Sequence, residues 1–191
     1  AWNYFAECLT KTSTTFKDNA FIFGKVYFPR LILPLSIVVS NLIRFFIQLL
    51  LFVIITVLFI ALGKTKMNIQ ITVLFFPLLV LIMAGLGLGA GLIITSMTTK
   101  YRDLALLVQF GVQLLMYTTL VIPLSATSGI LRKVLEMNPM IPIIDLLRQS
   151  LFNTNTPNFA LLAYSFTAMV ILLIFGIYIF SKTEKTFTDT V

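Results

Sequence analysis

Apolar and polar residues alternate along this chain in long blocks. Four predominantly apolar stretches cover residues 35–62, 70–96, 104–124 and 158–180. A helix needs about 20 apolar residues to cross the hydrocarbon core of a bilayer, and each stretch is long enough. The pattern therefore predicts an all-α fold, a polytopic bundle of membrane-spanning helices.

Acidic side chains are absent from all four stretches, and the chain has no His. Carriers driven by protons usually need a titratable Asp, Glu or His inside the membrane. If this protein moves a substrate uphill, we expect the energy to come from a partner outside the membrane.

Composition excludes several other functions. The mean hydropathy is +1.01, and hydrophobic residues make up 59% of the chain. Without His there is no Ser-His-Asp triad and no His-based metal site. Cys8 has no partner for a disulfide, and we expect it to be a small buried or lipid-facing residue. The net charge is +7, but only 11% of residues are charged, which is too few for a basic nucleic-acid-binding surface, so we expect no nucleic-acid partner. The positive charge is the kind expected of cytoplasmic loops that lie beside anionic membrane lipid.

The first sixteen residues are too polar for a lipid-exposed span, because Glu7, Lys11 and a run of Ser and Thr follow the opening aromatic residues. This segment is expected to be either a surface helix or a membrane helix shielded inside a bundle. The sequence leaves both alternatives open.

Basic residues predict the orientation of the bundle. One side carries Lys11, Lys17, Lys25, Arg30, Lys100, Arg102, Lys182 and Lys185. The other side carries Lys64, Lys66, Arg132, Lys133 and Arg148. The positive-inside rule places the richer side, and with it the C-terminus, in the cytoplasm.

The segment 125–157 is apolar but interrupted by Gly129 and three prolines. Proline ends a helix and restricts the residue before it, so we expect two short helices separated at Asn138-Pro139. Because these helices are apolar and too short to span the membrane, we expect them to be re-entrant or interfacial and protected by protein. An ordinary surface loop is the less favoured alternative, since large exposed apolar patches are unusual.

Polar residues inside the spans form stripes. In the first stretch, one helical face carries Ser36, Ser40, Asn41, Arg44, Gln48 and Thr56. Arg44 could extend its charge toward the cytoplasm, or the stripe could line an aqueous cavity or a helix interface. In the third stretch, Gln109, Gln113 and Tyr117 are four apart, with Phe110 beside them. Amides and flat rings suit a sugar, although glutamines also bond neighbouring helices in membranes.

Glycines are concentrated in the second stretch. Gly85 with Gly89, and Gly87 with Gly91, form two pairs of small residues on nearly opposite faces. Such pairs predict close approach of two neighbouring helices. The chain contains no GxxxxGK[ST] motif, so we expect no ATP binding through a phosphate-binding loop.

Four motifs carry a family resemblance. They read NAFIFGKVYFPRLILP at 19–34, YRDL at 101–104, LEMNPMIPIIDLLR at 135–148 and KTEKTFTD at 182–189. Together they resemble the membrane subunit of ABC-2 polysaccharide exporters of the O-antigen permease type, over essentially the whole chain. One difference is at 118–125, where TTLVIPLS stands in place of a pattern like TPVIYPLS, at the expected outer end of the channel.

The resemblance implies six spanning helices per subunit, a homodimer, and two separate ATP-binding cassette subunits at the bacterial inner membrane. ATP and Mg would bind in those subunits, and no cofactor is expected in this chain. Residues 1–191 would form a single transmembrane domain in which 1–16 resembles the second spanning helix. The family's N-terminal amphipathic helix and first spanning helix would be absent.

The resemblance also implies roles for particular residues. The ATPase contact would include Asn19, Phe21, Lys25, Tyr27, Phe28, Pro29 and Arg30, with Arg102 and Asp103 in a second loop. The outer gate would include Asn138, Pro139, Asp145 and Arg148. Independently of the resemblance, the polar stripes of the spans supply the channel-lining candidates Arg44, Gln48, Gln109, Phe110, Gln113 and Tyr117.

The function implied is a permease, not an enzyme, through which a lipid-linked polysaccharide is exported at the expense of ATP. A teichoic acid exporter and a drug or small-lipid exporter of the same fold are the alternatives. The ordered polar stripes argue against a membrane scaffold without a transport function.

Overall fold

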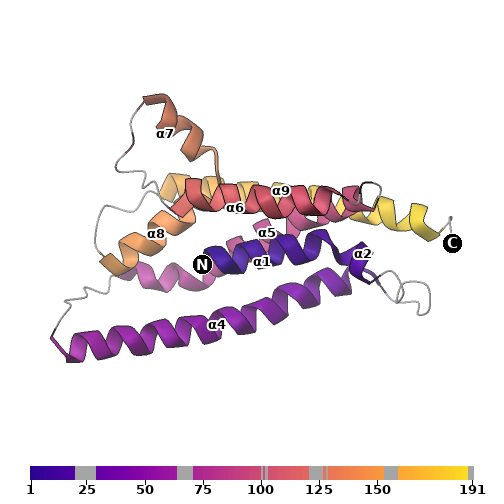
Figure 1. Cartoon of the computed structure of the whole chain (residues 1–191). Coiled ribbons are helices and arrows are strands. Elements are labelled where there is room, and N and C mark those ends of the chain that lie inside the picture. The colour runs from indigo at the N-terminus through magenta and orange to yellow at the C-terminus, as the bar shows by residue number, and fades with distance from the viewer. Residues whose placement is uncertain are drawn as a thin grey trace.

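The computed structural model describes residues 1–19, 29–63, 71–99, 101, 103–120, 127, 129–152 and 159–188, and all regular elements in these ranges are helical. They are α1 (Trp2–Ser13), α2 (Thr15–Asp18), α4 (Ile32–Ala61), the 3₁₀ helix η1 (Ile71–Phe75), α5 (Phe76–Thr98), α6 (Leu104–Leu120), α7 (Gly129–Glu136), α8 (Met140–Phe152) and α9 (Phe159–Thr188) (Figure 1). The predicted all-α fold is confirmed.

Three of the predicted spans are confirmed as long apolar helices. Within the described residues, helices long and apolar enough to cross a membrane cover Ile32–Ala61, Val73–Thr98 and Phe159–Glu184. The third predicted stretch forms the shorter apolar helix α6, which has 17 residues; positions 121–124 lie outside the described residues. The chain is therefore a multi-pass membrane protein.

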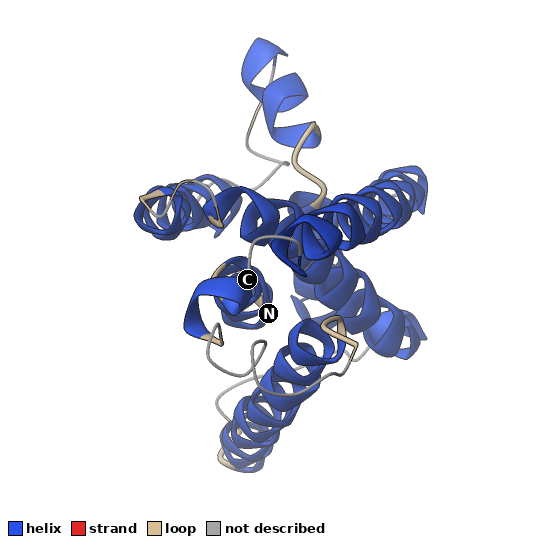
Figure 2. Cartoon of the chain, turned by 90° about the vertical axis from the view of Figure 1, so that its right-hand side faces the viewer, coloured by secondary structure: helices blue, strands red, loops and turns tan. Residues whose placement is uncertain are grey.

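The long helices run side by side, and α5 lies among them (Figures 1 and 2). Its principal packing partners are α9 and α1. In its most apolar window 44% of α5 is buried inside the chain, against 22% for α9 and 6% for α4. The core of the protein therefore follows α5.

Glycine allows α9 to touch the backbone of α5. A Cβ atom built on Gly89 would lie 2.7 Å from the carbonyl carbon of Leu172, and one built on Gly176 would lie 2.6 Å from the carbonyl oxygen of Gly89. Real Cβ atoms do not approach backbone so closely. Only glycine fits at this crossing.

The other pair of glycines faces α1. A Cβ atom on Gly87 would lie 2.8 Å from Cβ of Cys8, and one on Gly91 would lie 2.6 Å from Cβ of Thr12. The sequence prediction that the two glycine pairs serve two neighbouring helices is confirmed. The physical reason is that close backbone approach maximises dispersion contacts where no hydrophobic effect drives association.

Helix α1 is shielded inside the bundle, which decides between the two alternatives for the first sixteen residues. Trp2, Tyr4, Phe5 and Leu9 are each 6% exposed or less. Helices α5, α4 and α6 pack around α1. Cys8 is fully buried, which is one of the two placements expected for it.

Several helix ends meet at one end of the bundle, which is called the inner end. It contains the ends of α1, α2, α5 and α9 and the start of α4. Thr98 Oγ1 donates to the carbonyl oxygen of Ser13 at 2.8 Å, and the Phe16 amide donates to Thr95 Oγ1 at 3.4 Å. The Phe16 and Phe180 rings stack with centroids 4.7 Å apart. These segments share one side, as the loop charges predict, and its assignment to the cytoplasm stays a prediction.

The opposite end carries the outer helix pair, α7 and α8. Helix α7 ends at Glu136 and α8 begins at Met140, so the predicted break at Asn138-Pro139 is confirmed. Helix α8 packs into the bundle with Met140 and Ile143 buried, whereas α7 stands away from it (Figure 1). The re-entrant placement of the pair in a membrane stays a prediction.

Candidate functional site: a charged pocket between α1 and α4

Two polar stripes face each other where α1 meets α4. On α1, Asn3, Glu7 and Lys11 are four residues apart, so they share one helical face. On α4, the stripe identified in the sequence contributes Asn41, Arg44 and Gln48. The remaining residues of both helices over this length are mostly apolar.

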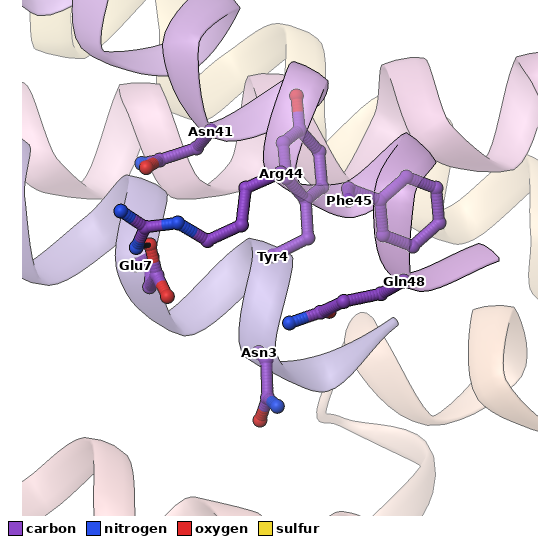
Figure 3. Close-up of a pocket in the computed structure, with 7 residues that line it drawn as sticks. All are labelled: Asn3, Tyr4, Glu7, Asn41, Arg44, Phe45 and Gln48. Carbon is purple, nitrogen blue, oxygen red and sulfur yellow. Dashed lines mark hydrogen bonds and ion pairs between the residues drawn. The ribbon is translucent and has the colours of Figure 1, made fainter. Parts of the chain in front are cut away.

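Glu7 is the centre of the contact. Arg44 Nη1 donates to Glu7 Oε2 at 2.5 Å, and Lys11 Nζ donates to the same oxygen at 3.0 Å. Lys11 Nζ also donates to Asn41 Oδ1 at 3.1 Å. Figure 3 shows the Arg44 side chain reaching from α4 toward Glu7 on α1. A single carboxylate thus bonds two cations, which leaves one positive charge without a matching negative one.

The ion pairs explain how Arg44 is tolerated at this depth. Arg44 lies ~18 Å along the axis from the start of α4 at Ile32, and its side chain is 56% exposed. A charge in the hydrocarbon region is costly unless it has a partner or reaches water. Of the two interpretations of this stripe, the bond to Glu7 supports a helix interface rather than an Arg44 side chain that extends toward the cytoplasm.

A small open pocket borders these charges. Its lining residues are Asn3, Tyr4, Glu7, Asn41, Arg44, Phe45 and Gln48 (Figure 3). The rings of Tyr4 and Phe45 pack together with centroids 5.2 Å apart and are 3% and 5% exposed. A ligand in the pocket would therefore meet amides and charges but no accessible ring face. Among the described residues, no three His, Cys, Asp or Glu side chains are grouped to hold a metal ion.

Sequence reasoning identified the α4 half of this pocket and missed the α1 half. Glu7 brings a carboxylate into the bundle, although the four predicted spans contain none. The signal that could have found it is the spacing of Asn3, Glu7 and Lys11, which matches the spacing of the α4 stripe.

The amide and aromatic stripe of α6 has a different environment. Gln109 and Gln113 are exposed, Phe110 is 63% exposed and Tyr117 is 57% exposed. A different face of α6 is buried in the chain through Ala105, Val112 and Thr119. This stripe does not line the pocket that contains Arg44 and Gln48. Helix α1 packs against both α4 and α6.

Some of the predicted ATPase-contact residues lie at the inner end. Asn19 follows α2 and donates to the Thr15 carbonyl at 3.0 Å, and Pro29 and Asp103 are exposed. Arg30 is only 9% exposed. It donates to the carbonyl oxygen of Glu184 at 3.2 Å, with Nε 3.8 Å from the Glu184 carboxylate.

The remaining predicted contacts, Phe21, Lys25, Tyr27, Phe28 and Arg102, lie outside the described residues.

The predicted gate residues connect α8 to its neighbours. The Asn138 side chain accepts from the Met140 amide at 3.0 Å and donates to Thr119 Oγ1 at 3.1 Å. The Pro139 carbonyl accepts from Ser165 Oγ at 2.8 Å, and Arg148 donates to the Leu120 carbonyl.

Asp145 accepts a hydrogen bond from Gln149 Nε2 at 3.3 Å. Burial raises the pKa of the Asp145 carboxyl, and the charge of Arg148 acts in the opposite direction. The four gate residues therefore bond within the segment 138–149 and to α6 and α9, and their role in an outer gate stays a prediction.

An all-α multi-pass bundle with an interrupted apolar helix pair is the architecture that the sequence resemblance predicts. The chain belongs to the ABC-2 type transporter family, whose pattern it matches over residues 2–152.

Three curated relatives are named as permeases of one type. Two proteins of Klebsiella pneumoniae named O-antigen export system permease protein RfbA are each 28% identical over 191 residues, which is 98% of this chain and 71% of the relative. A Myxococcus xanthus protein of the same name is 26% identical over 193 residues, covering 100% of this chain and 72% of the relative. The resemblance to O-antigen export permeases found in the sequence is confirmed.

Proposed function

We propose that this chain forms, with a second copy of itself, the channel for ATP-driven export of a lipid-linked polysaccharide across the bacterial cytoplasmic membrane. The observation that carries the proposal is the exposed face of α6. Gln109, Gln113, Phe110 and Tyr117 turn away from the rest of their own chain. Two amides facing lipid would be unfavourable, so this face needs water, a substrate or another protein surface.

The chemistry of the α6 face suits a glycan. Amide groups donate to and accept from sugar hydroxyls, and an exposed aromatic ring covers the apolar face of a pyranose. The pocket between α1 and α4 suits it less well, because its two rings are buried against each other. A drug or a small lipid would be matched better by an apolar face than by this one. A teichoic acid would be matched by the same amide and aromatic groups as a polysaccharide.

Energy is proposed to come from a separate ATP-binding cassette subunit that binds ATP and Mg and docks on the inner end. That end is proposed to face the cytoplasm, with the C-terminus. The relatives' names support this assignment, since they describe a permease within an export system. The protein itself is then a non-enzymatic membrane subunit.

The test is thiol accessibility along α6 in the whole permease assembled with its cassette subunit. Gln113→Cys is made in a Cys8→Ser background, with Leu114→Cys as the control. Leu114 is 52% exposed and Gln113 is also exposed, but the two positions point about 100° apart around the helix. A difference in reactivity would therefore report the environment outside the chain and not burial within it.

Gln113→Cys is expected to react with a water-soluble maleimide at least tenfold faster than Leu114→Cys. Polysaccharide stalled in the channel is expected to protect Gln113→Cys, since a sugar there excludes the reagent. If the Gln113→Cys thiol is inert in every transport state, the stripe is a helix–helix hydrogen-bonding surface and the proposed channel wall is wrong.

A further inference from the structure

The pocket between α1 and α4 contains more positive than negative charge. Glu7 Oε2 accepts from both Arg44 and Lys11, and the second bond of Lys11 goes to the neutral amide of Asn41. Glu7 is the only acidic residue of α1, and the helices that pack around α1, namely α4, α5 and α6, contain none. In this part of the described chain one net positive charge therefore has no negative partner.

These charges lie far from both ends of α4. From Arg44 the α4 axis extends ~18 Å to Ile32 and ~26 Å to Ala61, whereas the hydrocarbon core of a bilayer is about 30 Å thick. Phospholipid headgroups lie outside that core, so they do not reach Arg44 when α4 crosses the membrane. A charge at this depth needs a partner or water, and an anion that balances it has to arrive through an aqueous path.

Hydrogen-bond donors border the pocket from both helices. The Arg44 side chain is 56% exposed, and the Lys11 side chain is 45% exposed. A guanidinium has five N–H donors in one plane, and this fork fits the oxygens of a carboxylate or a phosphodiester. The amides of Asn3 and Gln48 border the same space (Figure 3). The arrangement therefore suits an oxyanion better than a cation or a neutral sugar.

The pocket is small as well as open. Its volume of about 10 Å³ is enough for roughly one water-sized group. The rings of Tyr4 and Phe45 are buried against each other, so no ring face is available to cover a pyranose. The pocket can therefore take charged oxygens that project from a sugar, but not the sugar ring itself.

We propose that this pocket binds a singly charged oxyanion on the transported glycan, so that the substrate is an acidic polysaccharide. The oxyanion is the carboxylate of an acidic sugar or a phosphodiester within the glycan chain, and either would balance the one excess positive charge. The inference rests on the proposed function in one respect, namely that a glycan passes these helices in water. The amides and rings of α6 then contact sugar hydroxyls and ring faces, and the pocket recognises charge.

The test compares two thiols that replace exposed glutamines, each in a Cys8→Ser background in the full permease assembled with its cassette subunit. Gln48→Cys lines the pocket, whereas Gln113→Cys lies on α6, which has no charged side chain. Each thiol is reacted with a sulfonate and with a trimethylammonium methanethiosulfonate reagent, and the rates are divided by those with free 2-mercaptoethanol. We expect the anionic-to-cationic ratio to be roughly tenfold higher at Gln48→Cys, because a positive site concentrates anions.

Charge variants test the sign of the effect. Arg44→Gln removes the excess charge, so it is expected to lower the ratio at Gln48→Cys to that at Gln113→Cys. Glu7→Gln leaves Arg44 and Lys11 both unbalanced, so it is expected to raise the ratio further. If the ion pair were only structural, both variants would disturb the same contact and shift the ratio in the same direction.

A second thiol position keeps the test decisive. If Gln48→Cys does not fold, Asn3→Cys is used in its place, because Asn3 lines the pocket from α1 and is exposed.

Ligands then identify the anion. Gln48→Cys is labelled with a neutral maleimide in the presence of trigalacturonate, glycerophosphoglycerol or maltotriose, the last being a neutral sugar of matched length. We expect a binding anion to slow labelling about fivefold at about four times its Kd, and maltotriose to have no effect. Which of the two anions protects distinguishes a carboxylate from a phosphodiester. Equal protection by maltotriose, or protection by inorganic pyrophosphate alone, would overturn the assignment to an acidic glycan.

The outcomes separate this inference from the proposed function. The inference alone is wrong if Gln113→Cys reacts with both reagents while Gln48→Cys shows no preference for the anionic one, or if both charge variants shift the ratio in the same direction. Anionic preference and protection at Gln48→Cys without ATP-dependent glycan export would contradict the proposed function and leave the anion site intact.

Discussion

Helices α4 and α5 are equally suited to a membrane by composition but differ in what surrounds them. Their most apolar windows have mean hydropathies of 2.7 and 2.4, yet 6% of the first is buried inside the chain against 44% of the second. Helix α5 carries four glycines in its central turns, and α4 carries none. Small residues, not apolarity, therefore determine which helix becomes the core.

Helix α4 buries Pro34, Asn41 and Phe45 within its own chain, while Arg44 and Gln48 of its polar stripe are exposed. Asn41 is 4% exposed and lies next to Glu7 and Lys11, while Ile47 and Leu50 are 64% and 61% exposed. Lipid solvates an apolar side chain as well as protein does, so burying it adds little, whereas a polar side chain needs a partner. Polar contacts through Glu7 and Lys11 and the Tyr4–Phe45 ring contact join α4 to α1, whereas close backbone approach at glycine joins α5 to its neighbours.

The largest effect is expected where a side chain is forced into the crossing of α5 and α9. Gly89→Leu would place atoms within the α9 backbone, which cannot move aside as a side chain can, so we expect a loss of about 3 kcal/mol or more. Gly111→Leu on α6 is the control, because nothing lies within 4 Å of its Cβ position. The measurement is the fraction of folded protein in gel filtration after detergent extraction. Equal yields would show that α5 does not pack through this face.

A smaller difference is expected between two leucines. Leu86 on α5 is 1% exposed and Leu51 on α4 is 57% exposed. Leu86→Ala leaves a cavity and should cost about 2 kcal/mol, the low end for such changes because the unfolded helix still lies in lipid. Leu51→Ala should change stability by less than about 0.5 kcal/mol. The midpoint of thermal aggregation in detergent distinguishes them, and a larger loss for Leu51→Ala would contradict the lipid-facing assignment of α4.

The smallest effect concerns the contact between α1 and α4. Glu7→Gln leaves both Arg44 and Lys11 without their carboxylate, whereas Arg44→Gln leaves Glu7 paired with Lys11. All three side chains are partly exposed, so we expect about 1 kcal/mol for Glu7→Gln and less for Arg44→Gln. A double-mutant cycle in the same thermal assay gives the coupling. Additive effects would mean that the ion pair contributes nothing to the interface.

The long helices were predictable because their signal is local. A run of about 20 apolar residues needs no tertiary contact to be recognised, and the break at Asn138-Pro139 follows from proline chemistry. The glycine pairs of α5 predicted that two helices pack closely against it, but they did not predict that these helices are α1 and α9. That choice depends on how the whole chain packs.

Helix α1 and the contacts of Arg30 were not predictable for a related reason. Glu7 and Lys11 make α1 too polar for a lipid-exposed span, and only their partners on α4 allow them to enter the bundle. Arg30 and Glu184 are separated by 154 positions. A local pattern contains no information on such a pairing, so the Arg30 side chain was assigned to the ATPase surface without the α9 contact that buries it.

The central claim is that this chain conducts a glycan and that another subunit supplies the energy. The most direct test is phosphate release and glycan transfer in proteoliposomes containing the permease alone or the permease with its cassette subunit. We expect no ATP hydrolysis by the permease alone, and ATP-dependent movement of lipid-linked polysaccharide across the bilayer only when both subunits are present. ATP turnover by the purified permease, or glycan transfer that needs neither ATP nor the second subunit, would contradict the account.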